Sequence, residues 1–333
     1  MTEEFNHKQA AHCETGVASN LMRHHGIAMS EPMAFGIASG LTFAYIGFVK
    51  INGMPLMAYR MPPRMILKML SKRIDGLEIR FDKFKSEEEG MRTLDEKIDC
   101  GDVVGLQTSV FFLPYFPKEM RFHFNAHNLL VYGKQGNDYQ ISDPVFSHTV
   151  EAASQDLMKA RFARGALAPK GAMYYLKKVP QSINYEKVIP KALKFTCRVN
   201  GRYNPMPFCG INGMKMIANK IDKLKKEDPR YARLFLGHIV RMQEEIGTGG
   251  AGFRYMYAAF LQEAGDLLQS ELLRDTSEDM IAVGDQWRQF ALLAARMSKE
   301  RGDQNYSDIA NKLREVAQME LSVYDKLSRF KLA

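Results

Sequence analysis

The sequence predicts an α+β chain with its strands in the first half and only helices in the second. Between residues 102 and 178, short apolar runs alternate with turn residues, as in β-strands. From residue 213 onward, apolar residues recur at three- and four-residue spacing, which is typical of helices buried on one face. A chain of 333 residues exceeds one ordinary core, so two domains are expected.

We expect these domains at residues 1–178 and 213–333, joined by an irregular linker at 179–212. Prolines interrupt the linker, namely Pro180, Pro190, Pro205 and Pro207. Two long apolar stripes follow, formed by Met280, Val283, Trp287, Phe290, Ala294 and Met297 and by Ile309, Leu313, Val316, Leu321 and Tyr324. Helices with such stripes predict an antiparallel helical bundle.

A cysteine is predicted at the start of the first helix. The apolar face of this helix consists of Val17, Ala18, Leu21 and Met22. Cys13 then lies in the first turn, where the positive end of the helix macrodipole favours thiolate over thiol. Most intracellular cysteines are instead small buried hydrophobes, so a nucleophilic role depends on the partners of this thiol.

A histidine and an aspartate are predicted to meet in a β-hairpin. His127 opens one strand, residues 136–138 form a turn, and Asp143 ends the partner strand. Antiparallel pairing brings these two ends within reach of a hydrogen bond. His123 would share the strand face of His127 and is the rival base. His127 is preferred because it stands directly before the apolar run.

A cysteine at a helix N-terminus, then a histidine, then an aspartate is the chain order of papain-like sites. In such a site Cys13 attacks a carbonyl, His127 takes and returns the proton, and Asp143 orients the imidazole. The sequence therefore predicts a papain-like cysteine peptidase-type N-terminal domain, followed by the C-terminal antiparallel helical bundle.

Two motif blocks resemble the butirosin biosynthesis protein H family. HCET at 12–15, SEPM at 30–33 and FGIASGLTF at 35–43 resemble its N-terminal domain, and GGAGFR at 249–254 with FLQEA at 260–264 is similar to its helical domain of unknown role. The founding member moves an amino-acyl group from an acyl carrier protein to an aminoglycoside amine. The resemblance implies an acyltransferase that carries an acyl group from a carrier-protein or CoA thioester to an amine or hydroxyl acceptor.

The expected oxyanion hole departs from that of papain-like peptidases, which place a glutamine six residues before the cysteine. His7 occupies this position here. Either the hole uses the Cys13 backbone N–H with Gln9 or His12, or hydrolysis is not the task of this site. This departure weakens the peptidase interpretation more than the acyltransferase one. Gly36 and Gly40 allow close backbone approach, either to a neighbouring element or to a ligand. Packing is the commoner reason, and Gly40 is the candidate for substrate binding.

Two charged residues are candidates for substrate binding. Glu31 could bind the amine acceptor, or it could stabilise the first turn of its own helix. Arg254 follows a glycine-rich break and could hold the phosphate of a phosphopantetheine arm. Alternatively, the glycines only turn one helix into the next, and Arg254 pairs with Glu263 or a neighbour.

Composition narrows the remaining classes. The four cysteines are scattered, so neither disulfides nor a metal site is expected. The net charge of +8 is dispersed, which suits an acidic carrier protein or a phosphate-bearing ligand better than nucleic acid, and an ordinary solvated surface without a charged partner explains it equally well. No apolar run approaches the roughly 20 residues of a membrane span, so a cytoplasmic protein is expected.

No cofactor is expected beyond the phosphopantetheine or CoA of the donor. Two other classes stay open. A cysteine peptidase or thioesterase would use the same three residues, and a non-catalytic binding module would keep the fold without needing Cys13. The sequence leaves the acyl group, the acceptor and the oligomeric state open.

Overall fold

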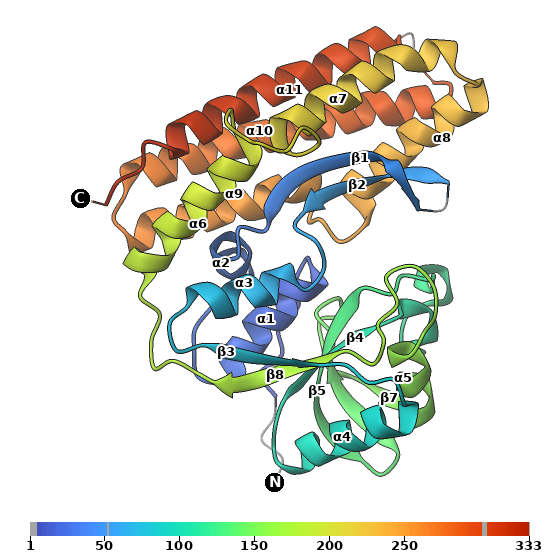
Figure 1. Cartoon of the computed structure of the whole chain (residues 1–333), viewed down its shortest axis with the longest axis vertical. Helices are drawn as coiled ribbons and strands as arrows, with labels where there is room; N and C mark the ends of the chain where they lie inside the picture. Colours follow the sequence, from blue (N-terminus) through green and yellow to red (C-terminus); the bar gives the residue numbers. More distant parts are fainter. Residues whose placement is uncertain (1–4, 52, 302–304, 333) are drawn as a thin grey trace. The chain divides into compact units, whose positions relative to one another are not determined.

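The computed structural model describes residues 5–51, 53–301 and 305–332, and the chain separates into two compact units (Figure 1). Unit 1 consists of the chain up to Ala34 together with Ile66–Ile183. Unit 2 consists of Phe35–Met65 together with the chain from Asn184 onward. The chain therefore enters unit 2 twice.

Unit 1 is built on a six-stranded antiparallel sheet with the spatial order β3-β8-β4-β5-β6-β7. The strands are β3 (Glu78–Asp82), β4 (Val104–Thr108), β5 (His127–Gln135), β6 (Asp138–Ser142), β7 (Val150–Ala153) and β8 (Met173–Lys178). The predicted hairpin of β5 and β6 is confirmed, with Leu130 opposite Ser142. Gly136 has a positive φ of 61° and makes the tight turn between these strands.

The helices of unit 1 pack against this sheet. They are α1 (Cys13–His24), α3 (Met65–Arg73), α4 (Glu87–Asp99) and α5 (Ser154–Arg161), and the short α2 (Glu31–Ile37) begins in this unit. α1 contacts β5, and its residues from Glu14 to Met22 are buried. α4 and α5 bury Leu94 and Leu157 in one core with Leu129 and Val131 of β5. Helices and an antiparallel sheet thus make unit 1 an α+β fold, as predicted.

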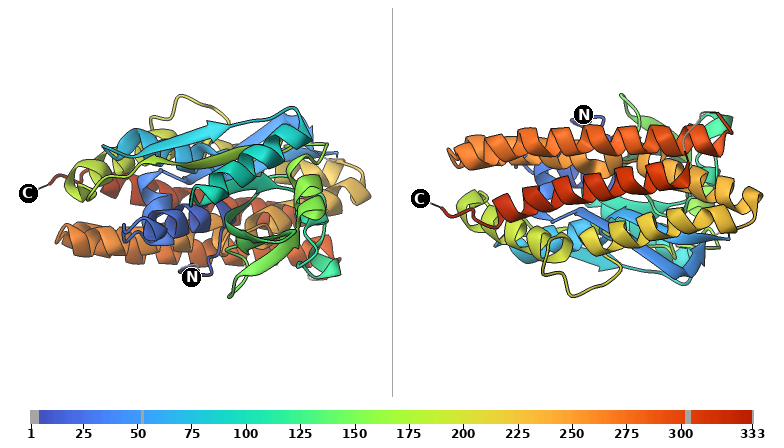
Figure 2. Two further views of the ribbon diagram at one scale, coloured as in Figure 1. Left: turned by 90° about the horizontal axis from the view of Figure 1, so that it is seen from below. Right: turned by 90° about the horizontal axis from the view of Figure 1, so that it is seen from above.

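Unit 2 contains the predicted antiparallel bundle. Its helices are α6 (Tyr185–Asn200), α7 (Gly210–Lys223), α8 (Pro229–Val240), α9 (Arg254–Leu267), α10 (Glu271–Ser298) and α11 (Tyr306–Leu327). α11 lies between α10 and α7 in the right-hand view of Figure 2, and it contacts both. Trp287 and Phe290 of α10 are buried in the core. No helix in the described part of the chain is both long and apolar enough to cross a bilayer.

The structure corrects two of the expected boundaries. Residues 35–65 were expected in the N-terminal domain, but the strands β1 (Leu41–Ile51) and β2 (Met54–Arg60) pair with each other and pack on helices of unit 2. The linker at 179–212 was expected to be irregular, but α6 occupies half of it. α6 tolerates Pro190 inside the helix because its buried apolar face, which includes Ile189, outweighs a cost of about 3 kcal/mol for the proline.

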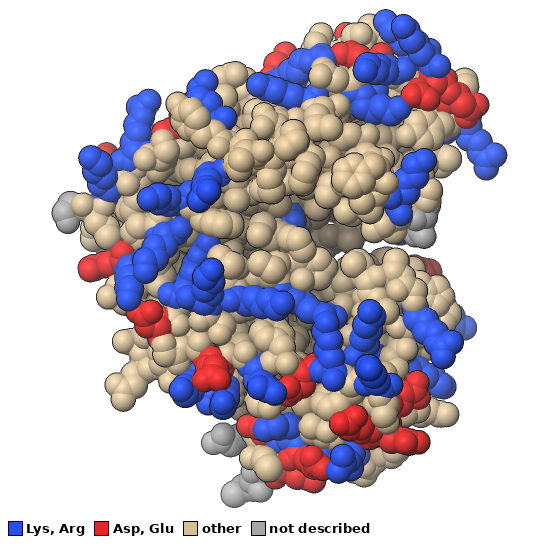
Figure 3. All heavy atoms as spheres, in the orientation of Figure 1, with Lys and Arg blue, Asp and Glu red and all other residues tan. Residues whose placement is uncertain are grey.

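Charged side chains of both signs lie on the face shown in Figure 3. In the view of Figure 3, Lys and Arg side chains are interspersed with Asp and Glu, and no single basic block covers this face. Although the net charge is +8, the visible face therefore lacks the basic stripe that nucleic-acid binding usually requires.

Candidate active site

Cys13 is the first residue of α1, and the backbone before it is held tightly. The Glu31 carboxylate accepts hydrogen bonds from the backbone N–H of Ala11 (3.0 Å) and of His12 (2.8 Å) and from the Thr15 hydroxyl (2.9 Å). The His12 side chain caps the helix by accepting from the Thr15 N–H. Because these contacts fix both sides of Cys13, its thiol has a defined position at the positive end of the helix.

His127 and Asp143 form the buried pair that the hairpin predicts. His127 Nε2 lies 2.7 Å from Asp143 Oδ2, and the two side chains are only 4% and 0% exposed. Asp143 also accepts from the Tyr115 hydroxyl at 2.9 Å and from the Val145 N–H at 3.1 Å. The carboxylate is thus fixed by several donors, and in turn fixes the imidazole ring.

The surroundings of His127 favour its charged form. Burial alone would lower its pKa, but attraction and hydrogen bonding to Asp143 and an interaction with Cys13 outweigh burial and raise the pKa to about 10. Nε2 is engaged by Asp143, which leaves Nδ1 for the thiol. An imidazolium beside Cys13 stabilises the thiolate, which is the reactive form of a cysteine. The three predicted catalytic residues therefore lie together in unit 1.

Asn128 is an additional residue at the thiol that the sequence did not indicate. Its Nδ2 lies 3.9 Å from Cys13 Sγ, while its Oδ1 accepts a hydrogen bond from the Tyr174 hydroxyl at 3.1 Å. Nδ2 also donates to the Ala126 carbonyl. The amide is therefore oriented from both ends. In the sequence, only the position next to His127 could have pointed to Asn128. Nothing in the sequence pointed to Tyr115, because it lies in an irregular connection.

The expected oxyanion-hole side chains have other contacts. Gln9 is exposed, and its amide donates to the Val145 carbonyl at 3.0 Å. His7, at the position of the papain glutamine, lies 2.8 Å from both the Ser142 hydroxyl and the Phe146 carbonyl. These contacts tie the N-terminal segment to the end of β6. Together with the capping role of His12, they leave the backbone N–H groups at the start of α1 as the best oxyanion donors.

Glu31 is not placed as an amine-binding group. Burial raises the pKa of its carboxyl, and the hydrogen bonds from Ala11, His12 and Thr15 lower it again in part. Both oxygens are used to hold the start of α1. The other interpretation, that Glu31 stabilises the first turn of its own helix α2, is incomplete. The helix that Glu31 stabilises most directly is α1, which begins at Cys13.

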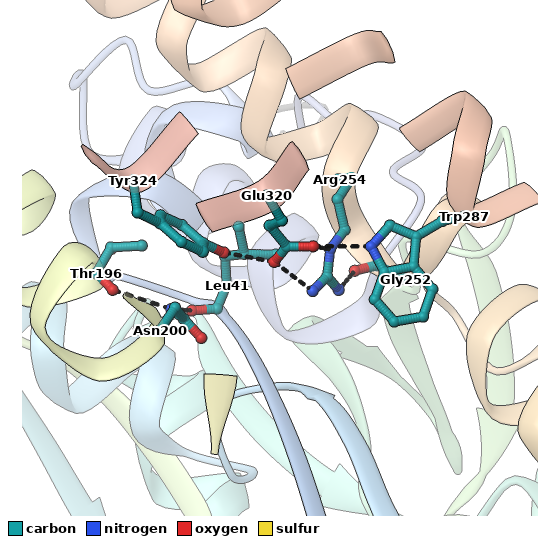
Figure 4. A network of polar contacts seen from close by, with 8 residues as sticks. All are labelled: Leu41, Thr196, Asn200, Gly252, Arg254, Trp287, Glu320 and Tyr324. Atoms are coloured by element: carbon teal, nitrogen blue, oxygen red, sulfur yellow. Dashed lines mark hydrogen bonds and ion pairs between the residues drawn. The ribbon is translucent and has the colours of Figure 1, made fainter. Parts of the chain in front are cut away.

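Gly40 and Arg254 belong to unit 2. Gly40 has a structural place between α2 and β1, where its N–H donates to the Phe35 carbonyl and its carbonyl accepts from Met61. The Arg254 guanidinium is fully buried and donates to both carboxylate oxygens of Glu320 (Figure 4). Because burial removes Arg254 from solvent, the expectation that it holds a phosphate is wrong. The alternative expected Arg254 to pair with Glu263 or a neighbour; Arg254 does form an ion pair, but its partner is Glu320, 66 residues further along the chain.

The rival base His123 lies away from β5 in the connection before it. Its ring is exposed and stacks on Phe111 at 4.1 Å, whereas the contact to Asp143 is made by His127. Over the residues that the structure describes, no group of three or more His, Cys, Asp or Glu is arranged to hold a metal ion. The four cysteines are free thiols.

Two family models match this chain in sequence. Residues 12–144 match "Butirosin biosynthesis protein H, N-terminal", and residues 155–327 match "Domain of unknown function (DUF4872)". No curated protein matches the chain. A crystal structure of a protein from Bacillus anthracis, described as a C39-like peptidase, is 14% identical with a TM-score of 0.37, and the match covers 53% of this chain and 96% of that one.

The first family match contains Cys13, His127 and Asp143, which lie together at the start of α1. The second spans most of the helices of unit 2 and covers more than half of the chain. Both occur in the order that the motif blocks predicted. The chain therefore belongs to the butirosin biosynthesis protein H family, in which that N-terminal domain precedes the domain of unknown function.

Proposed function

We propose that this protein is an acyltransferase that moves an acyl group from a carrier-protein or CoA thioester to an amine or hydroxyl acceptor in a biosynthetic pathway. The observation that carries the proposal is the buried His127–Asp143 pair beside Cys13 at the start of α1. Membership of a family named for a biosynthesis protein supports group transfer over protein degradation. The same three residues would also serve a hydrolase, in which water is the acceptor. A transferase and a hydrolase are therefore distinguished by the acceptor of the acyl group.

In the first half-reaction, the Cys13 thiolate attacks the carbonyl carbon of the donor thioester. A new C–S bond forms to Sγ, and the negative charge on oxygen is stabilised by backbone N–H groups at the start of α1. The intermediate collapses by breaking the C–S bond to the donor. The imidazolium of His127 gives its proton to the departing donor thiolate, while Asp143 holds the ring in place.

In the second half-reaction, an amine or hydroxyl attacks the acyl group on Cys13. Neutral His127 takes a proton from the attacking nitrogen or oxygen, and the C–S bond to Cys13 breaks. This step regenerates the thiolate and the imidazolium. Exchange of one thioester for another is nearly isoenergetic, so the acyl group can be stored on Cys13. A direct attack of the acceptor on the donor thioester, with His127 as the base, is the alternative without an acyl-enzyme.

Intact mass spectrometry after mixing with acyl-loaded carrier protein tests the proposal. We expect an acyl adduct on the wild-type chain that maps to Cys13 and disappears on addition of an amine. Cys13→Ala should prevent the adduct. Cys100→Ala is the matched control because Cys100 is an exposed cysteine of the same unit, at the end of α4, and should leave the adduct intact.

Other outcomes distinguish the alternatives. Amide product without any adduct would retain the transferase but remove the covalent step. Free acid released at the same rate with and without amines would identify a thioesterase or peptidase-type hydrolase. Absence of adduct, product and free acid with every donor would contradict the proposal and favour a binding module.

A further inference from the structure

The connection between β4 and β5 surrounds the His127–Asp143 pair. It leaves β4 after Thr108, which is paired with His127 across the sheet, and it returns to the chain at His127 itself. From inside this connection, Phe116 packs edge-on against the His127 ring at 5.4 Å, and Tyr115 donates to Asp143. The inner side of the connection is therefore part of the candidate active site.

The outer side of the same connection is apolar and exposed. Phe111, Met120 and Phe122 have exposed fractions of 41%, 46% and 41%, and Leu167 on the neighbouring segment reaches 50%. These are four of the five large apolar side chains that are exposed among the described residues of unit 1, the fifth being Val179. Such a concentration on one surface typically marks an interaction site.

Hydrogen bonds join the two segments into one surface. Asn125 donates to the carbonyls of Arg164 (3.2 Å) and Ala166 (2.9 Å), and Gln107 donates to the carbonyl of Leu167 (3.2 Å). All of these donors are buried. The segment that bears Leu167 is therefore anchored to the chain just before His127, and the apolar side chains are held at a fixed place beside the active site.

Basic side chains accompany this apolar surface. Lys118, Arg121, Arg164 and Lys170 lie on the same two segments, which contain Glu119 as their one acidic residue. Within the described ranges, none of these four cations forms an ion pair. Elsewhere in unit 1, by contrast, Lys and Arg are commonly paired with carboxylates, as in Lys97–Asp102, Lys134–Asp95 and Lys177–Glu78. The two segments therefore carry an excess of positive charge together with the exposed apolar side chains.

We propose that this surface docks the acidic carrier protein that delivers the acyl thioester. The docking face comprises the apolar residues Phe111, Met120, Phe122 and Leu167 and the basic residues Lys118, Arg121, Arg164 and Lys170. This inference rests on the proposed function. An apolar centre with a basic rim fits a small acidic protein, since the apolar contact supplies affinity while the charges steer and orient the partner. A free CoA donor offers anionic groups but no apolar protein surface.

Charge reversal on the rim tests the docking face. Lys118→Glu/Lys170→Glu changes two exposed cations of the docking face, and Lys225→Glu/Lys226→Glu makes the same change in charge on exposed residues of unit 2. The assay measures acylation of Cys13 by octanoyl-loaded acyl carrier protein and by octanoyl-N-acetylcysteamine. We expect kcat/KM for the carrier protein to fall at least tenfold through KM, and the small thioester to react as with wild type. The control pair should change neither value by more than twofold.

A neutral substitution tests the apolar centre. Met120→Ser should weaken the carrier-protein reaction about fivefold, whereas Val179→Ser changes the fifth large apolar side chain that is exposed among the described residues of unit 1 and should have no effect. Binding is measured separately by calorimetry, with octanoyl-loaded carrier protein and Cys13→Ala protein that cannot turn over. This readout does not depend on acyl transfer, so failure of the docking face and failure of the proposed function are distinguishable.

Several results would overturn the proposal. Equal losses with both donors would mean that the substitutions disturb the active site. Unchanged binding and turnover of the carrier protein would exclude this surface as its docking site. A rim variant that abolishes a dimer seen by analytical ultracentrifugation, without changing carrier binding, would assign the surface to a second copy of this chain.

Discussion

Replacement of Glu320 tests the buried polar network of unit 2. The Glu320 carboxylate is 1% exposed and accepts from Arg254 Nε (3.2 Å), Arg254 Nη2 (2.8 Å), Trp287 Nε1 (2.8 Å) and the Tyr324 hydroxyl (2.6 Å). Glu320→Gln keeps the size of the side chain but removes the charge that compensates Arg254. Because Arg254 is fully buried, it would remain as an uncompensated cation.

The expected magnitude follows from this burial. Removing one partner of a buried ion pair costs about 3–5 kcal/mol, and the cation–π contact with the Trp287 ring, 4.7 Å from the guanidinium, exists with either residue at position 320 and so does not offset this cost. For a unit of this size, each 1 kcal/mol lowers Tm by roughly 2–4 °C. We therefore expect Glu320→Gln to lower the Tm of unit 2 by about 6–20 °C.

Fluorescence of the full chain provides the assay, because Trp287 is the only tryptophan and lies in the core of unit 2. Glu315→Gln is the matched control on the same helix. Its carboxylate is 66% exposed and 3.5 Å from Lys312 Nζ, so its loss should cost about 0–1 kcal/mol. The reasoning would be refuted if both variants melted within 2 °C of each other. A Glu320→Leu/Arg254→Met variant should be more stable than Glu320→Gln, since it leaves no buried charge.

Three further predictions concern unit 1. The pKa of His127 is raised from an unfolded value near 6.5 to about 10, so the stability it contributes is fully present below about pH 6.5 and is lost as the pH rises through about 10. Urea titrations between pH 6 and 10.5 should show this loss in wild type and not in His127→Gln. Tyr115→Phe removes one hydrogen bond to a buried carboxylate and should slow acylation of Cys13 roughly tenfold, measured by quenched-flow mass spectrometry, with unchanged rates excluding a positioning role. Gly105→Ala would place a Cβ 2.0 Å from the Tyr174 ring and should destabilise by about 1–3 kcal/mol in denaturant titrations, whereas Gly237→Ala, with no atom within 4 Å of its Cβ, should be neutral or stabilising.

Local patterns predicted the parts of the site that depend on sequence neighbours. The start of α1 follows from its apolar face, and the meeting of His127 with Asp143 follows from a hairpin whose short turn sets the register. Strand alternation fails for residues in irregular segments. His123 was therefore assigned to a strand face that it does not share, and Tyr115 was missed altogether.

Long-range pairing accounts for the remaining errors. Arg254 and Glu320 are separated by 66 residues, and no spacing rule links them before the helices pack. The same is true of Asn128, whose amide is oriented by Tyr174 from another strand. The helix around Pro190 was missed because proline was weighted as a breaker, whereas burial of its apolar face decides the conformation. For Gly36 and Gly40, the sequence left packing or a ligand open, with packing as the commoner reason. A Cβ at Gly36 would meet the Phe260 ring at 1.9 Å, which indicates packing at this position.

Unit 2 is formed by two separate segments of the chain, and this has a consequence for synthesis in the cell. The ribbon of β1 and β2 leaves the ribosome early, but α6, which contacts β1 and precedes α7, begins only at Tyr185. At about 5–20 residues per second, this helix is made roughly 6–25 s after the ribbon. During that interval Phe43 and Tyr59, which are buried in the finished protein, have no helix of unit 2 to cover them. A nascent chain stalled before α6 is therefore the form of this protein that should depend most on chaperones.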